Sequence, residues 1–201
     1  MILNGLLALV GAYLLGAIPF GFLLVKLTSG KDVRASGSGN IGATNVLRTS
    51  GKGLGIGTLI LDILKGLAAV WLADWLTGNS PLWTSAAALV VMAGHSYSVF
   101  LGFKGGKAVA SFVGAFGYLT PLPLLAVAIL FFIVVGTTRY ISAASVLCAA
   151  TFPLGVWLIL HPSPEILLAS FIGGWFIVYR HKANLERIRA GTENVFRWSS
   201  K

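Results

Sequence analysis

Residues 104–139 read KGGKAVASFVGAFGYLTPLPLLAVAILFFIVVGTTR, and the fold depends on how this stretch is divided. Two apolar runs, 108–119 and 122–136, lie between basic residues and are separated by a Thr-Pro-Leu-Pro sequence. Each run is shorter than the approximately 17 residues that a helix needs to cross a bilayer, and proline interrupts helices. The stretch is therefore either one kinked helix or two short ones.

The whole chain has the composition of a membrane protein. Of its 201 residues, 56% are hydrophobic and only 10% are charged, whereas soluble domains have roughly 25% charged residues. The mean hydropathy is +0.86. A helix uses about 20 apolar residues for each crossing, so the chain allows at most about nine crossings and no separate soluble domain. We expect one compact membrane bundle.

The apolar stretches predict seven helices. The first stretch lacks the basic segment and the A-x-A site of a cleaved signal peptide, so we interpret it as a membrane helix. The predicted ranges are about 3–27, 54–76, 82–100, 108–119, 122–136, 141–160 and 166–178.

Lysine and arginine residues decide how residues 104–139 are divided. Basic loops lie on the cytoplasmic side of a membrane, and fourteen of the fifteen Lys and Arg residues fall in alternate connections or in the C-terminal tail. One kinked helix would place Lys104 and Arg139 on opposite sides and remove this asymmetry. We therefore predict an all-α integral membrane protein with a single transmembrane domain over residues 1–201. It has seven transmembrane helices, the N-terminus outside and the C-terminus cytoplasmic, and two short helices near the middle of the chain, buried in the bundle.

The charge balance and the cysteine content exclude several classes of protein. Fifteen basic and six acidic residues give a net charge of +9, but nucleic-acid-binding domains are rich in charge throughout. No nucleic acid is therefore expected, and the basic surplus faces a membrane surface or an anionic substrate. The single cysteine, Cys148, lies in an apolar run and allows neither a disulfide framework nor a CxxC site.

The first basic connection, residues 36–55, combines many glycines with Asn40, Asn45, Arg48 and Lys52. Glycines let backbone N–H groups turn toward one anion, and an arginine can close on it with two hydrogen bonds. It is not a Walker A loop, because Gly53 follows Lys52. The alternative is a flexible Gly/Ser linker, although a linker does not need the asparagines or the arginine.

The second basic connection places Lys104 and Lys107 around Gly105 and Gly106, at the start of a short helix. Helix N-terminal amides and two ammonium groups together favour a phosphate. The alternative is a pair of lysines that mark the membrane boundary by extending toward water. His95, in an apolar helix, is expected to be a hydrogen-bonded packing residue.

Two further pairs have helical i, i+3 spacing. His181 and Asn184 open the basic C-terminal tail, which can also bind anionic headgroups. Asp62 and Lys65 lie within the range 54–76, where isolated charges are costly. We expect Asp62 and Lys65 to neutralise each other, with a functional role as a hypothesis.

The inventory of reactive residues limits the chemistry. There is no G-x-S-x-G elbow for covalent catalysis and no H-x-x-x-H or D-x-D cluster for a metal, so neither a metal nor a cofactor is expected. A cation-rich and amide-rich site at the cytoplasmic face fits anionic groups and charge that develops during transfer from a lipophilic donor. This favours lipid phosphate metabolism or, alternatively, anion transport.

Four segments resemble the motifs of the bacterial acyl-phosphate:glycerol-3-phosphate acyltransferases, namely residues 36–48, 61–66, 94–110 and 181–193. The resemblance spans nearly the whole chain. It implies a multi-pass protein of the bacterial inner (plasma) membrane that moves an acyl chain from acyl phosphate to the sn-1 hydroxyl of glycerol 3-phosphate. The products would be lysophosphatidic acid and phosphate, in the first step of phospholipid synthesis, with functional coupling to the acyl-phosphate-forming enzyme.

The resemblance also implies roles for individual residues. Catalysis is assigned to Ser36, Arg48, His181 and Asn184. Binding of glycerol 3-phosphate is assigned to Lys104, Gly105, Gly106, Lys107 and Ser142. Binding of acyl phosphate is assigned to Ser38, Asn40, Asn45 and Lys52, and Gly191, Glu193, Asp62 and Lys65 are structural or motif residues.

Several alternatives stay open. We expect direct transfer without an acyl-enzyme, with the hydroxyl proton taken by His181 or by a substrate phosphate oxygen. A small transporter for a phosphorylated metabolite would use the same cations for selectivity, and a structural membrane protein could recruit lipid enzymes through the basic tail. The sequence does not choose the acyl-chain length, the oligomeric state, which phosphate site holds which substrate, or whether thioester donors are used.

Overall fold

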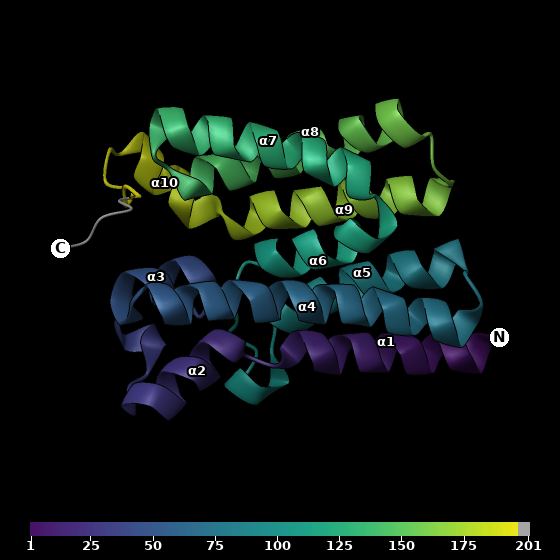
Figure 1. The fold of residues 1–201 in the computed structure, drawn as a ribbon, viewed down its shortest axis with the longest axis horizontal. Helices are drawn as coiled ribbons and strands as arrows, with labels where there is room; N and C mark the ends of the chain where they lie inside the picture. Colours follow the sequence, from purple (N-terminus) through teal and green to yellow (C-terminus); the bar gives the residue numbers. More distant parts are fainter. Residues whose placement is uncertain (197–201) are drawn as a thin grey trace. The chain divides into compact units, whose positions relative to one another are not determined.

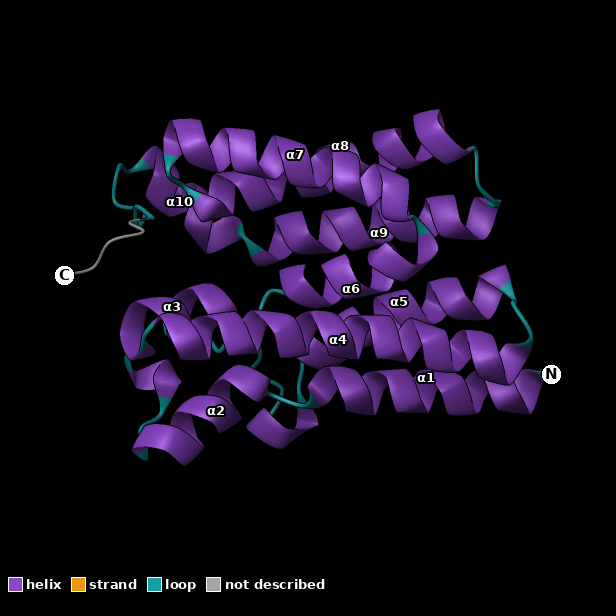
Figure 2. Cartoon of the chain, in the orientation of Figure 1, coloured by secondary structure: helices purple, strands orange, loops and turns teal. Residues whose placement is uncertain are grey.

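Residues 1–196 are described by a computed structural model, and in this range the chain contains ten α-helices, two short 3₁₀ helices and no strand (Figure 2). The all-helical class predicted from the sequence is confirmed. Arg197 and Lys201, which contributed to the count of basic residues, lie outside the described residues. The chain divides into two compact units, residues 1–119 and 120–201.

The first unit holds the N-terminal helices (Figure 1). In it, α4 packs against α1, α5 and α6, and α1 also packs against α5. Gly66 and Gly114 bring α4 and α6 close together, because a Cβ atom on either one would collide with a backbone carbonyl of the other helix. The elements are α1 (Ile2–Ala17), α2 (Phe20–Ser29), η1 (Val33–Ala35), α3 (Ala43–Ser50), α4 (Lys52–Thr77), α5 (Pro81–Ser96), η2 (Val99–Leu101) and α6 (Val109–Leu119).

The second unit consists of α7 (Pro121–Thr138), α8 (Ile141–Leu160), α9 (Pro164–Arg180) and α10 (Lys182–Arg189). Here α8 packs against both α7 and α9, and the short α10 contacts α8 and α9. Gly174 lets α9 approach the Ala149 carbonyl of α8, where a Cβ atom would collide.

The apolar range 3–27, which was expected to form one helix, is interrupted at Ile18 and Pro19, between α1 and α2. Proline has no N–H to continue the helical ladder, so carbonyls of the preceding turn lose their partners. Other parts of the unit supply donors: Lys65 Nζ donates to the Ile18 carbonyl at 2.8 Å, and Ser98 Oγ donates to the Ala17 carbonyl at 2.6 Å. Tertiary contacts thus allow the break.

The expectation of two short, buried helices in the middle of the chain is half right. α6 is short and buries Phe112, Ala115 and Phe116. α7, however, runs for 18 residues, and only Pro123 in it is buried. The prediction was wrong for α7 because both prolines lie in its first turn, where a missing N–H costs nothing. The apolar side chains after them are exposed or half-buried.

Five segments are long and apolar enough to cross a membrane. They are Ile2–Ser29, Lys52–Thr77, Pro81–Leu101, Pro121–Thr138 and Ile141–Leu160. The exposed Trp71, Phe132 and Leu158 lie in three of them, as is usual for helices whose outer faces contact lipid. The segment Val109–Leu119 is apolar but shorter.

Candidate functional site

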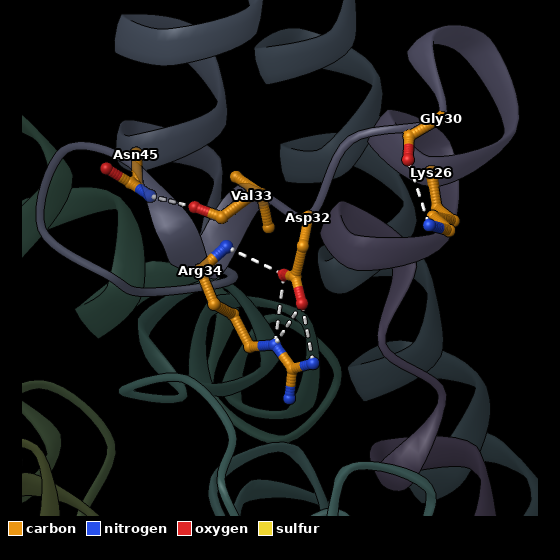
Figure 3. A network of polar contacts seen from close by, with 6 residues as sticks. All are labelled: Lys26, Gly30, Asp32, Val33, Arg34 and Asn45. Atoms are coloured by element: carbon orange, nitrogen blue, oxygen red, sulfur yellow. Dashed lines mark hydrogen bonds and ion pairs between the residues drawn. The ribbon is translucent and has the colours of Figure 1, made fainter.

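The glycine-rich connection after α2 is folded around one side chain, Asn45 of α3, which is 2% exposed. We call residues 33–51 the Asn45 loop. The Asn45 Nδ2 group donates to the carbonyls of Val33 at 3.2 Å, Ser36 at 3.2 Å and Asn40 at 2.8 Å. The Asn45 Oδ1 atom accepts the Ser38 N–H at 2.8 Å. One amide therefore fixes four points of the loop backbone, and Figure 3 shows its bond to Val33.

An apolar cluster lies beneath this loop and joins it to α2. It consists of Val25, Val33, Ile41 and Val46. Gly37 takes a positive φ of 62° next to Asn45, where a Cβ atom would collide with the Asn45 side-chain oxygen. The alternative of a flexible linker is therefore wrong for this segment.

The Asn45 loop presents three other side chains to its surface. Ser36, Ser38 and Arg48 are exposed, and among residues 1–196 their side chains form none of the hydrogen bonds that hold the loop together. Asn40, by contrast, accepts the Gly42 N–H at 2.8 Å at the start of α3. The asparagines thus shape the loop, whereas the hydroxyls and the guanidinium are available to a ligand. Lys52, exposed at the start of α4, follows the loop.

Two nearby cations that the sequence did not single out have defined partners (Figure 3). The Arg34 guanidinium pairs with the Asp32 carboxylate at 2.7 Å and lies 5.0 Å from the centre of the Phe22 ring. The hydrogen bond from Arg34 holds the pKa of Asp32 below its ordinary value. Lys26 Nζ donates to the Gly30 carbonyl at 2.9 Å, at the end of α2. These cations close local turns.

The segment Lys104–Lys107, which we call the glycine turn, differs from the expected phosphate cradle in one respect. The Gly105 and Gly106 N–H groups donate to the carbonyls of Ser96 and His95, each at 3.0 Å, so they serve the fold and not an anion. A Cβ atom on Gly106 would collide with the His95 imidazole. Lys104 is exposed and Lys107 is partly buried. Attraction of an anion to this turn would therefore come from the lysine side chains and not from the glycine N–H groups.

A buried charged group lies in the first unit, and we call Asp62, Lys65 and His95 the Asp62 cluster. Lys65 Nζ is 2.9 Å from Asp62 Oδ1, and both side chains are only 2% exposed. His95 Nδ1 is 3.6 Å from the same oxygen, at 4% exposure. The expected neutralisation of Asp62 by Lys65 is confirmed. The role of His95 beside them was missed, because its separation from Asp62 along the chain gives no spacing signal.

In the second unit, the Glu193 carboxylate accepts hydrogen bonds from three side chains. We call Glu193 and its partners Ser142, Asn184 and Arg187 the Glu193 cluster. Ser142 Oγ donates at 3.0 Å and Asn184 Nδ2 at 2.7 Å to Glu193 Oε1, while Arg187 Nε donates to Oε2 at 2.8 Å. Burial raises the pKa of Glu193, but these hydrogen bonds outweigh it and hold the pKa below its ordinary value. Sequence reasoning selected three of these residues and missed Arg187.

His181 lies between α9 and α10 and is 3% exposed. Its Nδ1 is 2.7 Å from the Ile177 carbonyl. Because a carbonyl only accepts, Nδ1 carries the proton, and in the neutral ring the lone pair is on Nε2. His181 is the N-cap of α10, the residue just before the helix, whereas Asn184 lies in the first turn of the helix. Gly191, with a φ of 67°, turns the chain after this helix toward Glu193.

Metal-binding side chains do not gather in the described part of the chain. Within residues 1–196, no group of three or more His, Cys, Asp or Glu residues has the arrangement to hold a metal ion. The exposed side chains of the Asn45 loop and the glycine turn are instead cations and hydroxyls, which suit anionic ligands.

Comparisons with known proteins agree with one another. A family model described as glycerol-3-phosphate acyltransferase matches residues 6–191. Curated glycerol-3-phosphate acyltransferases include one from Geobacter sulfurreducens, 45% identical over 97% of this chain and 99% of its own length, and one from Geobacter metallireducens, 48% identical over 96% and 97%. A crystal structure of PlsY, an integral membrane glycerol 3-phosphate acyltransferase in its glycerol 3-phosphate form, is 36% identical, with a TM-score of 0.90 over 96% of both chains. The lysophosphatidic acid form gives a TM-score of 0.86 at 35% identity.

The two asparagines of the Asn45 loop should respond differently to aspartate. Asn45→Asp removes an amide that donates to three carbonyls and places a carboxylate against them, so it should open the loop. Asn40→Asp keeps the oxygen that accepts the Gly42 N–H, so it should leave the loop closed. Limited proteolysis in detergent should cut Asn45→Asp within residues 33–42 and spare both Asn40→Asp and wild type. Equal cutting of the two variants would contradict the role of Asn45.

The Glu193 cluster should stabilise the protein in a pH-dependent way. Because the pKa of folded Glu193 is below its ordinary value of 4.5, its carboxylate adds stability above that pH, and this stability is lost as the pH falls through the lowered pKa. Glu193→Gln does not titrate at this position. The difference in Tm between wild type and Glu193→Gln in detergent should therefore be largest near neutral pH and should shrink below pH 4.5.

The matched control is Glu186→Gln, at an exposed position of α10, the helix that supplies Asn184 and Arg187 to the cluster. It should leave the Tm close to that of wild type at every pH. A Tm difference for Glu193→Gln that does not change with pH would show that the carboxylate charge does not stabilise the cluster.

Proposed function

Since the chain belongs to the glycerol-3-phosphate acyltransferase family of integral membrane proteins, we propose that it moves an acyl chain from acyl phosphate to the sn-1 hydroxyl of glycerol 3-phosphate. The products are lysophosphatidic acid and phosphate, and the reaction is the first step of bacterial phospholipid synthesis. The observation that carries the proposal is the Asn45 loop. Its buried amide fixes the backbone while Arg48, Ser36 and Ser38 stay exposed toward a ligand.

Arg48 and the loop hydroxyls are assigned to the acyl phosphate. A guanidinium can hold a phosphate with two hydrogen bonds, and Ser36 and Ser38 can donate to the oxyanion that develops on the acyl carbonyl. Lys52 adds a second cation at the start of α4. Asn40 and Asn45 act on the acyl phosphate indirectly, because their amides serve the loop backbone.

Glycerol 3-phosphate is assigned to the glycine turn. Lys104 and Lys107 supply the charge that neutralises its phosphate, and Gly105 and Gly106 allow the turn its close approach to His95. Ser142 is a further substrate contact. Its proton is directed to Glu193, so its oxygen lone pairs can accept a hydrogen bond from a substrate hydroxyl.

The transfer proceeds without an acyl-enzyme. The sn-1 oxygen forms a bond to the acyl carbonyl carbon, the bond from that carbon to the phosphate oxygen breaks, and the hydroxyl proton passes to a base. Phosphate is a good leaving group, so positioning and charge neutralisation supply most of the acceleration. The base is either His181, through the lone pair on Nε2, or a phosphate oxygen of the substrate. Asn184 positions groups through Glu193.

We also propose a topology of seven crossings, with the N-terminus outside and the C-terminus in the cytoplasm of the bacterial inner membrane. Five segments are long enough to cross the membrane, and we assign the two remaining crossings to α6 and α9, which are 11 and 17 residues long. The apolar composition of α6 and of residues 166–178 within α9, and the absence of Lys and Arg from residues 120–123 and 161–165, support this count. The active site then opens to the cytoplasm, where an acyl-phosphate-forming enzyme can supply the donor.

Single cysteines test the topology, with Cys148 replaced by alanine. We expect a membrane-impermeant maleimide to label Asn79→Cys and His161→Cys in intact spheroplasts, and to label Lys104→Cys and Arg139→Cys only after lysis. The decisive comparison is Lys104 with Arg139, because seven crossings place both inside. Labelling of Arg139→Cys in intact spheroplasts would overturn the count.

An activity assay tests the reaction. Purified protein with labelled glycerol 3-phosphate should form lysophosphatidic acid from palmitoyl phosphate, without added metal, and not from palmitoyl-CoA. Lys104→Ala should lose most activity through a higher KM for glycerol 3-phosphate, whereas Lys31→Ala, an exposed lysine outside the assigned sites, should not. Saturable uptake of glycerol 3-phosphate into vesicles without any acyl product would favour a transporter.

His181→Ala decides between the two bases in the same assay. A loss of more than about tenfold in kcat, roughly 1.4 kcal/mol of barrier, supports His181 as the base. A smaller loss leaves the substrate phosphate oxygen in that role.

A further inference from the structure

We infer that the Asp62 cluster positions the glycine turn, so that His95 is a positioning residue for the binding of glycerol 3-phosphate. This inference rests on the proposed assignment of that substrate to Lys104 and Lys107. The contacts run from the core of α4, through the His95 ring at the end of α5, to the backbone between the two lysines.

The His95 ring spans the distance between α4 and the glycine turn. Its Nδ1 lies 3.6 Å from Asp62 Oδ1, and its Nε2 side faces Gly106 so closely that a Cβ atom there would collide with it. The side chain is 4% exposed. The ring is therefore packed between the Asp62 carboxylate on one edge and the Gly106 backbone on the other, which leaves the turn little room to move.

The backbone of the last turn of α5 holds the same segment. Carbonyls at the C-terminus of a helix lack partners within the helix. Those of His95 and Ser96 accept the N–H groups of Gly106 and Gly105, each at 3.0 Å. The last turn of α5 therefore holds the two glycines in two ways: its carbonyls accept their N–H groups, and the His95 ring packs against Gly106.

Asp62 is itself fixed in place. Its carboxylate pairs with Lys65 at 2.9 Å, and Lys65 Nζ also donates to the Ile18 carbonyl at the break between α1 and α2. Burying these charges is costly in an apolar helix, and packing alone would not need a carboxylate beside His95. The position of the turn is thus tied to three helices of the unit.

The consequence for the reaction is specific to one substrate. A shift of the glycine turn moves the two ammonium groups relative to the phosphate they hold, and so weakens binding of glycerol 3-phosphate. It leaves Arg48 and the Asn45 loop, which are assigned to the acyl phosphate, unchanged. An altered KM for one substrate with an intact kcat is the expected signature.

Three variants test the inference: His95→Phe, which keeps the ring and loses its nitrogens, Asp62→Asn, which loses the charge, and His95→Asn, which keeps a donor toward Asp62. We expect His95→Phe and Asp62→Asn to raise the KM for glycerol 3-phosphate by about tenfold or more, with kcat within about threefold and the KM for palmitoyl phosphate unchanged. For His95→Asn, the increase in the logarithm of the KM for glycerol 3-phosphate should be at most half of the increase for His95→Phe.

Met92→Leu is the matched control, because Met92 is buried in the same helix and the change nearly conserves volume. It should leave both KM values unchanged. A lower kcat for His95→Phe with an unchanged KM would indicate only a smaller folded fraction, and it would overturn the inference. If Asp62→Asn does not fold, His95→Phe and His95→Asn decide alone, since both leave the Asp62–Lys65 pair intact.

Lys104→Ala separates this inference from the proposed function. If Lys104→Ala raises the KM for glycerol 3-phosphate and His95→Phe does not, the positioning role fails while the substrate assignment stands. If Lys104→Ala leaves that KM unchanged, the substrate assignment itself fails.

Discussion

The ion pair between Asp62 and Lys65 links the core of the first unit to the break between α1 and α2 and, through His95, to the glycine turn. Two charges in the apolar helix α4 must be neutralised inside the protein, because lipid supplies no partner. Lys65 also meets the Ile18 carbonyl that the Pro19 break leaves without a helical donor. The break between α1 and α2 and the buried charge therefore compensate each other. Through His95 the same pair reaches the backbone that carries Lys104 and Lys107.

The two glycine-rich connections share one design. In each, a buried polar side chain next to a helix end holds the backbone: Asn45 beneath its loop and His95 against the glycine turn. The cationic side chains of Arg48 and Lys104 are exposed and take no part in holding these backbones. Preorganised charges lose little entropy when a ligand binds, which is why anion sites favour this separation of supporting and contacting groups. The Glu193 cluster is built differently, because its carboxylate accepts from three side chains and not from the backbone.

Sequence reasoning failed where a local rule has a tertiary exception. Pro121 and Pro123 correctly separated two predicted helices, but they were placed in the connection, whereas they lie in the first turn of α7. Pro19 was passed over within an apolar range, yet it divides α1 from α2, because Lys65 and Ser98 supply the missing donors. Gly105 and Gly106 were assigned to the binding of glycerol 3-phosphate through the family resemblance, but their N–H groups donate within the fold. Their actual acceptors, at the end of α5, have no signature in sequence spacing.

Composition and apolar periodicity were enough to determine an all-helical membrane protein, because these properties depend on runs of neighbouring residues. The motif residues likewise indicated the family, which the comparisons show. Only the tertiary structure decided which of those residues hold the backbone in place and which have side chains that can contact a ligand. That decision depends on partners far apart in the chain, such as Ser142 and Glu193, separated by 51 positions. Hydrogen bonds act over about 3 Å of space, and a sequence records no distances between separate helices.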